Sequence, residues 1–241
     1  IGKIAFHGMH EDVGAPTGCL VRGQRHCQLW IHNGKYWAAE IAFIAALCFL
    51  ILFRTMERYF TNGGNMELTD AIAEGLMHTV MEQAIILRDD PQNYNARAEV
   101  MWAGSLSHNG LTGLGAPNDF APHQLGHVLS GKYGVAHGAS LSAVWGSWAR
   151  YCYETNPDRF VQFGREVWGV DGAMPAIEAA ENYFRSLEMP VCLSELGVPV
   201  QDQAGLEDLA QRCTFDRTRT IGTFRILDYG DILQIYQLAN H

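Results

Sequence analysis

The chain has 241 residues, of which 48% are hydrophobic and 18% are charged, so it has room for one large globular domain or two small ones. This composition excludes a disordered, collagen-like or coiled-coil protein. Acidic residues outnumber basic ones by 26 to 17, which gives a formal net charge of −9. We therefore expect no nucleic-acid partner that is bound through its phosphates. The acidic excess lies entirely after residue 56, since residues 1–56 are net positive.

The cysteines indicate a reducing compartment. Six cysteines occur without a Cys-x-x-Cys pair, and a chain of this length can build a core without a disulfide framework. We expect packed, free thiols, including Cys152, Cys192 and Cys213. No secretory signal is visible at the start of the sequence. The predicted location is the cytoplasm.

An apolar run at Ile41–Phe53 raises the question of a membrane helix. The run is thirteen residues long, and Glu40 interrupts its extension toward the N-terminus. A membrane-spanning helix needs about 20 apolar residues, with roughly 17 as the lower limit. We therefore predict a buried core helix or an unnatural segment, and no membrane partner. A membrane anchor over Trp37–Phe53 is the alternative.

Helical patterns begin after Met56. Residues 1–35 contain six glycines and show weak periodicity, so they are interpreted as loop or poorly specified structure. Residues 66–87 carry an apolar stripe at helical spacing, with Thr69 and Asp70 suited to the N-terminal cap. No convincing strand follows residue 56, which predicts an all-α domain after an irregular N-terminal segment. Further helices are expected over 95–107, 121–130, 138–153, 158–167, 174–187, 205–212 and 228–238.

Three histidines form the strongest chemical signal. His123 and His127 are four residues apart, so a helix places both imidazoles on one face, where they can share a metal ion or a proton path. A turn with Gly131 and Gly134 can bring His137 back toward them. Neutral imidazoles suit Zn, Fe, Ni or Cu, but such sites commonly need a carboxylate and a further histidine, which spacing alone does not identify. An accidental histidine pair is the alternative.

Six motifs occur in order along the chain: MERYFT at 56–61, NARAEVMWAG at 95–104, SHNGL at 107–111, YGVAHGA at 133–139, TIGTF at 220–224 and DILQIY at 231–236. Together they resemble the iron-containing alcohol dehydrogenase family, in particular its NAD(P)H-dependent butanol dehydrogenases and aldehyde reductases. The resemblance covers about residues 53–241. It implies a C-terminal all-α domain that holds Fe²⁺ or Zn²⁺ beside a nucleotide-binding α/β domain. The metal polarises the oxygen of a small alcohol or aldehyde while hydride moves to or from NAD(P)H.

The resemblance also implies roles for the three histidines. His123 and His137 match two metal ligands, and His127 matches a histidine near the nicotinamide that handles a proton. The family's other two ligands, an Asp and a His, fall on Leu50 and Arg54, neither of which can bind a metal ion. The resemblance assigns no nucleotide-binding residue in this chain. We expect a homodimer.

The N-terminal part lacks a recognisable cofactor domain, so we divide the chain into an atypical segment at 1–53 and a helical metal-binding dehydrogenase domain at 54–241. The glycine-rich stretch 110–115 superficially resembles a phosphate loop. It follows a helix and precedes Pro117, so we interpret it as an interhelical loop. Two explanations of residues 1–54 are open: a shifted reading frame, or a degenerate protein that kept the helical domain for another purpose.

The predicted function is a metal-dependent alcohol dehydrogenase or aldehyde reductase, truncated or inactive as an isolated chain. The alternative is a non-catalytic helical module, derived from the same family, that oligomerises or binds a partner. Two further predictions concern packing. Trp102, Trp145, Trp148 and Trp168 are expected in the core. Glu188 stands where relatives often have a glycine that ends a helix, which is expected to reduce stability.

Overall fold

The computed structural model describes the backbone of residues 36–241 and the side chains of residues 44–241. Within this part the chain forms helices, and strand pairing is limited to one isolated antiparallel bridge between Ile221 and Leu227. The all-α prediction is confirmed for these residues. The helices are α2 (Tyr36–Tyr59), α3 (Glu67–Asp89), α4 (Tyr94–His108), α5 (Ala121–Tyr133), α6 (His137–Cys152), α7 (Pro157–Phe163), α8 (Ala173–Ser186), α9 (Gln203–Cys213) and α10 (Tyr229–Ala239), with short turns η1 (Leu111–Gly113), η2 (Tyr153–Thr155) and η3 (Gly164–Trp168).

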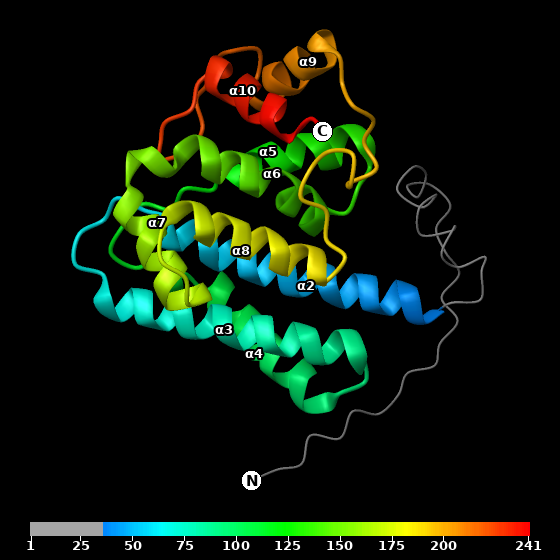
Figure 1. Cartoon of the computed structure of the whole chain (residues 1–241), viewed down its shortest axis with the longest axis vertical. Coiled ribbons are helices and arrows are strands. Elements are labelled where there is room, and N and C mark those ends of the chain that lie inside the picture. The colour runs from blue at the N-terminus through cyan, green and yellow to red at the C-terminus, as the bar shows by residue number, and fades with distance from the viewer. Residues whose placement is uncertain (1–35) are drawn as a thin grey trace.

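Helix α2 runs through the middle of the bundle, with α3 and α4 on one side and α5, α6, α9 and α10 on the other (Figure 1). It packs against α3, α4 and α6. Its apolar run places Phe49, Leu52 and Phe53 in the core, each at most 1% exposed. A helix that is apolar on several faces is stable where neighbours surround it, so the core-helix prediction is confirmed for residues 48–53 of the run, whereas Leu47 is 39% exposed. Among the described residues, no helix combines the length and apolar character that crossing a bilayer requires.

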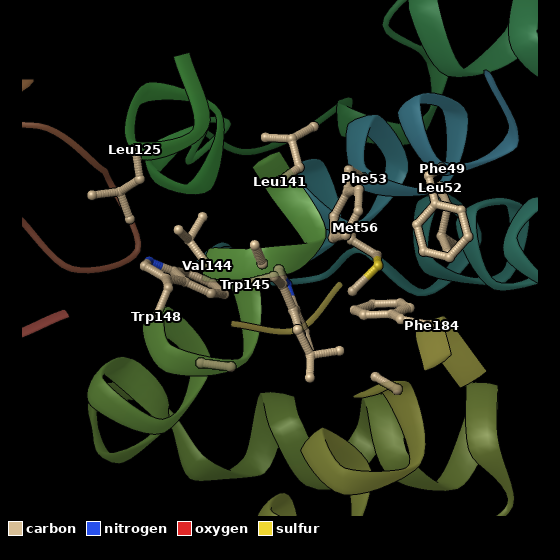
Figure 2. Close-up of a cluster of buried hydrophobic side chains, with 14 of the residues drawn as sticks. Phe49, Leu52, Phe53, Met56, Leu125, Leu141, Val144, Trp145, Trp148 and Phe184 are labelled. Atoms are coloured by element: carbon tan, nitrogen blue, oxygen red, sulfur yellow. The ribbon is translucent and has the colours of Figure 1, made fainter. Parts of the chain in front are cut away.

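The core joins side chains of α2, α5, α6 and α8 (Figure 2). The ring of Phe184 meets Phe53 and Trp145 edge to face, at centroid distances of 5.3 and 5.7 Å. Trp145 and Trp148 are buried, as predicted, and Trp168 is partly buried against the core. The prediction is wrong for Trp102, which is 63% exposed. Helix α4 buries the stripe Ala96, Val100, Ala103 and Ser107, and residue 102 lies off that stripe.

The predicted cap of α3 is wrong. The helix begins at Glu67 without a side-chain cap. Thr69 Oγ1 instead donates to the carbonyl of Leu114 at 3.2 Å. Asp70 is buried and accepts two hydrogen bonds, each 2.6 Å, from the guanidinium of Arg159 on α7. The acidic residue that looked like a cap therefore ties α3 to α7.

The remaining predicted helices are present in the structure. Their predicted ends lie within three residues of the observed ends, except for the helix predicted at 158–167. There α7 ends at Phe163 and the chain continues as the π-helical turn η3. The stretch 110–115 forms η1 and its flanks between α4 and α5, as an interhelical loop. The division at residue 53 falls inside α2, which passes through it without a break, and the division stays a prediction. The loop predicted at residues 1–35 lies outside the described residues.

Candidate active site

The structure brings the three predicted histidines together. His123 and His127 lie one turn apart on α5, and His137 is the first residue of α6. The centroid of the His123 ring lies 5.9 Å from that of His127 and 5.3 Å from that of His137. His127 and His137 stack at 4.6 Å, with 19° between the ring planes. The three imidazoles therefore form one cluster.

Two glycines allow the two helices to meet in this way. Gly134 ends α5 in the left-handed conformation, with a φ of 67°, and so reverses the chain toward His137. Gly126 faces α6, and a Cβ there would lie 2.9 Å from a methyl of Leu141 and 3.0 Å from Ser140 Oγ. A larger residue at 126 would push α6 away. The close approach of the helices thus depends on the residue between His123 and His127.

The cluster opens to solvent at one end. His123 is buried, with 4% of its surface exposed, His137 is partly buried and His127 is exposed. A small molecule can therefore reach His127 and His137 directly. His123 forms the floor of the cluster.

Helix α2 places a buried carboxylate beneath His123. Glu57 Oε1 accepts a hydrogen bond from the backbone N–H of His123 at 2.7 Å, and Oε2 lies against His123 Nδ1. Apart from that contact, neither Oε2 nor Nδ1 has a hydrogen-bond partner in the described part of the chain. The sequence analysis did not assign Glu57 to the site. The signal available in the sequence was the place of Glu57 within the motif MERYFT at 56–61, shortly after the apolar run.

A second buried carboxylate fixes the start of α5. Asp119 Oδ2 accepts from the N–H of Ala121 at 3.0 Å, and Oδ1 accepts from the N–H groups of Thr223 and Phe224 at 2.7 and 2.8 Å. Carboxylates are stabilised at a helix N-terminus because free N–H groups point there. Asp119 thereby fastens the segment before α10 to the helix that carries His123.

Helix α2 also places a positive charge beside the cluster. Arg54 lies over the ring of Phe120, with Cζ 5.2 Å from the centroid, and Arg58 lies over the same ring at 5.7 Å. Arg54 is partly exposed, and within the described residues its guanidinium makes no ion pair or hydrogen bond. Arg58, in contrast, is buried and donates to the carbonyl of Ser107.

Burial and positive neighbours keep the imidazoles neutral. Burial, and after it the charges of Arg54 and Arg58, lowers the pKa of His123 to about 3. Burial and the neighbouring histidines and Arg54 lower the pKa of His137 to about 4. The pKa of His127 is lowered by the same kinds of cause. Burial raises the pKa of Glu57, partly opposed by the hydrogen bond from His123.

The residues present do not make a complete site for a divalent metal ion. Two imidazoles on one ion, with Zn–N distances of about 2.0–2.1 Å, place their centroids about 5 Å apart, so the pair His123 and His137 has a suitable separation. His137 Nδ1 is buried and has no hydrogen-bond partner. However, no three His, Cys, Asp or Glu side chains within the described residues are arranged to share an ion. The charge of Arg54 opposes a cation at this place.

The family of this chain is identified by its similarity to known proteins. Residues 49–240 match the model of the Fe-containing alcohol dehydrogenase family, C-terminal domain. The chain belongs to the iron-containing alcohol dehydrogenase family. This confirms the resemblance inferred from the six motifs.

The relatives that the chain resembles are named as alcohol dehydrogenases and aldehyde reductases. The chain is 32% identical over 195 residues to the NADH-dependent butanol dehydrogenase A of Clostridium acetobutylicum, covering 78% of this chain and 49% of that protein. It is 33% identical over 150 residues to an NADPH-dependent aldehyde reductase of Escherichia coli, covering 60% and 39%. The crystal structure of the NADH-dependent butanol dehydrogenase A of Thermotoga maritima superimposes with a TM-score of 0.76 at 27% identity, covering 82% and 52%. The chain spans about half the length of the curated relatives it matches.

Proposed function

We propose that this chain is the substrate-side helical part of an NAD(P)H-dependent enzyme that interconverts a primary alcohol and an aldehyde. The observation that carries the proposal is the convergence of three neutral imidazoles at an opening of the helical bundle, with His127 exposed. The family match over residues 49–240 and the names of the relatives support the same reaction.

In this proposal His127 handles the proton of the substrate oxygen. In the oxidising direction a neutral imidazole accepts the hydroxyl proton of the alcohol, and in the reducing direction it returns the proton. His137 stacks on His127 and holds its ring in place. Bound nicotinamide supplies or accepts the hydride, but the described residues contain no nucleotide-binding fold, so we assign it no binding residue.

Fe²⁺ or Zn²⁺ at His123 and His137 stays a prediction, and we derive no step through a metal ion because the donor set present does not fit one. A homodimer and a cytoplasmic location also stay predictions. Sedimentation of the purified chain measures the oligomeric state.

The test is butanal reduction by the purified chain with NADH and with NADPH. Because the described residues contain no nucleotide-binding fold, the wild-type chain alone is expected to turn over slowly. His127→Ala is expected to lower its kcat/KM by about 10²- to 10⁴-fold, the usual contribution of a proton-transfer group. His78→Ala is the matched control, because His78 is exposed on α3 and contacts only the carbonyl of Glu166 among its hydrogen-bond partners.

The second candidate is a non-catalytic helical module. Arg54 beside the histidines is the observation that favours it, since a family member that uses a metal ion has no need of a guanidinium there. Folded wild-type protein without turnover on either nucleotide, with or without added Fe²⁺ or Zn²⁺, would support the module and contradict the enzyme.

A further inference from the structure

We propose that Arg54, together with the open imidazoles of His127 and His137, binds a small oxyanion group, a carboxylate or a phosphate, at the mouth of the histidine cluster. The proposal does not depend on catalysis and goes beyond the proposed function. It follows from the same misfit that speaks against a resident metal ion.

The groups around the cluster favour an anion. The N–H donors near it are Arg54 and Arg58 from α2, the imidazoles of α5 and α6, and His108 from α4. Two carboxylates lie close, and both are buried and engaged: Glu57 with His123, and Asp119 with three backbone N–H groups. The open side of the cluster therefore offers the Arg54 guanidinium and imidazole N–H groups. Neither of the two carboxylates just named is accessible there.

Arg54 differs from two buried arginines of the bundle in having no hydrogen-bond acceptor among the described residues. Arg58 donates to Ser107, and Arg159 binds Asp70. Arg54 rests on the face of Phe120, a contact that uses the plane of the guanidinium and leaves its N–H edge available. That edge matches the two oxygens of a carboxylate or phosphate.

The Phe120 ring on which Arg54 rests is fixed by its backbone. Phe120 adopts the left-handed conformation, with a φ of 54°, which is uncommon for a residue other than glycine. Asp119 and Ala121 on either side of it are joined by a hydrogen bond, and the N–H of Asp119 donates to the carbonyl of Glu57. The Phe120 ring also meets His123 edge to face at 5.6 Å. Arg54 is thereby held over the ring that packs on His123, at a place from which its charge also acts on His127 and His137.

The affinity expected for a free oxyanion is modest. A few charge-assisted hydrogen bonds in contact with water bind weakly, so an arginine with one or two imidazole N–H groups gives a dissociation constant on the order of millimolar. A larger ligand that carries the anionic group would add its own contacts.

The experiment is an NMR titration of the histidine side chains of the full chain with inorganic phosphate and, separately, with acetate, at constant ionic strength. We expect saturable shifts of the His127 and His137 resonances. Arg54→Gln is expected to weaken binding about tenfold or more, and Arg54→Lys is expected to retain part of it, because charge stays while the two-pronged geometry is lost. Arg165→Gln is the control, since Arg165 is exposed on η3 and pairs with Asp171.

Each outcome bears on the proposal. Saturation by both anions supports an oxyanion site, and saturation by acetate alone or phosphate alone identifies the preferred group. Unchanged binding in Arg54→Gln, or no saturable shift with either anion, overturns it. Stoichiometric Zn²⁺ retained by the wild-type protein through dialysis also overturns it. If Arg54→Gln does not fold, the loss of affinity in folded Arg54→Lys decides. Because no turnover is measured, failure here leaves the proposed reaction to its own test.

Discussion

Glu57 contacts both the backbone N–H and the imidazole ring of His123. Its Oε1 accepts from the N–H of His123, in the first turn of α5, while Oε2 faces Nδ1 of the same histidine. A carboxylate beside Nδ1 favours the tautomer with a proton on that nitrogen and leaves Nε2 as the acceptor. The orientation of His123 is thus set by α2 and not by α5 alone.

This arrangement predicts different effects of two substitutions at Glu57. Glu57→Ala leaves the His123 N–H buried without an acceptor, and we expect it to reduce the free energy of unfolding by about 2–4 kcal/mol, from the lost hydrogen bond and the cavity. Glu57→Gln keeps an amide oxygen that can accept from the same N–H, so a smaller loss is expected. Urea unfolding of both variants measures the difference. Equal losses would show that the hydrogen bond to His123 does not matter.

At the scale of elements, the helices were predictable from spacing and stop signals, because apolar stripes and Asp-Pro or Gly breaks are local. Their ends were less predictable where tertiary contacts compete. Asp70 looked like a cap and instead binds Arg159. Trp102 looked like core and faces solvent, since the composition of α4 does not say which side is covered. The π-helical turn η3 has no local sequence signal that we recognise.

The end of α8 places Glu188 in the conformation that glycine prefers, and the predicted loss of stability can be tested there. Glu188 has a φ of 58°, and the N–H of Met189 donates to the carbonyl of Phe184 at 3.0 Å, so the helix ends in a left-handed cap that glycine prefers. We expect Glu188→Gly to increase the free energy of unfolding by about 1 kcal/mol, because the left-handed conformation costs other residues about that much. Thermal or urea unfolding measures the change.

The control for this substitution is the same change inside a helix. Glu82 is exposed in α3, where glycine is expected to cost about 1 kcal/mol. Opposite signs at positions 188 and 82 would attribute the gain to the left-handed cap. Destabilisation at both would contradict the prediction.

At the scale of the whole molecule, a few buried polar contacts join segments distant in sequence. Arg159 on α7 binds Asp70 on α3 and also donates to the carbonyl of Tyr59 at the end of α2, at 2.7 Å. Asp119 joins α5 to the segment before α10. Such contacts fix how the helices are arranged, and spacing within one helix does not reveal them.

The ion pair at Asp70 gives a global test. Asp70→Ala leaves the buried guanidinium of Arg159 without its carboxylate, and we expect the free energy of unfolding to fall by about 3–5 kcal/mol. Asp158→Ala is the control, because Asp158 is exposed in the first turn of α7, and we expect it to cost less than about 1 kcal/mol. Chemical denaturation of both variants makes the comparison. Similar losses would mean that the pair does not join α3 and α7 energetically.

The candidate site was predictable to the extent that its signals were local. The spacing of His123 and His127, with a glycine turn before His137, was enough to expect a cluster. Glu57 and Arg54 required knowledge of which helix packs beneath α5, because both act from α2 on residues far along the chain. Similarity to the family pointed to position 54 as a departure, but only the charges around it indicate what Arg54 is suited to bind.

The reactivity of three buried cysteines can be used to measure local opening of the bundle. Cys48 in α2, Cys152 at the end of α6 and Cys213 at the end of α9 are free and at most 1% exposed, and burial raises the pKa of Cys48 and Cys213 to about 12. A thiol reagent can modify each cysteine only when the helices around it separate. The thiol then meets water and can ionise to the reactive thiolate. Labelling followed by peptide mass analysis would therefore measure the rate of local opening around each of the three cysteines. The slowest of the three would identify the part of the bundle that opens only when the whole chain unfolds.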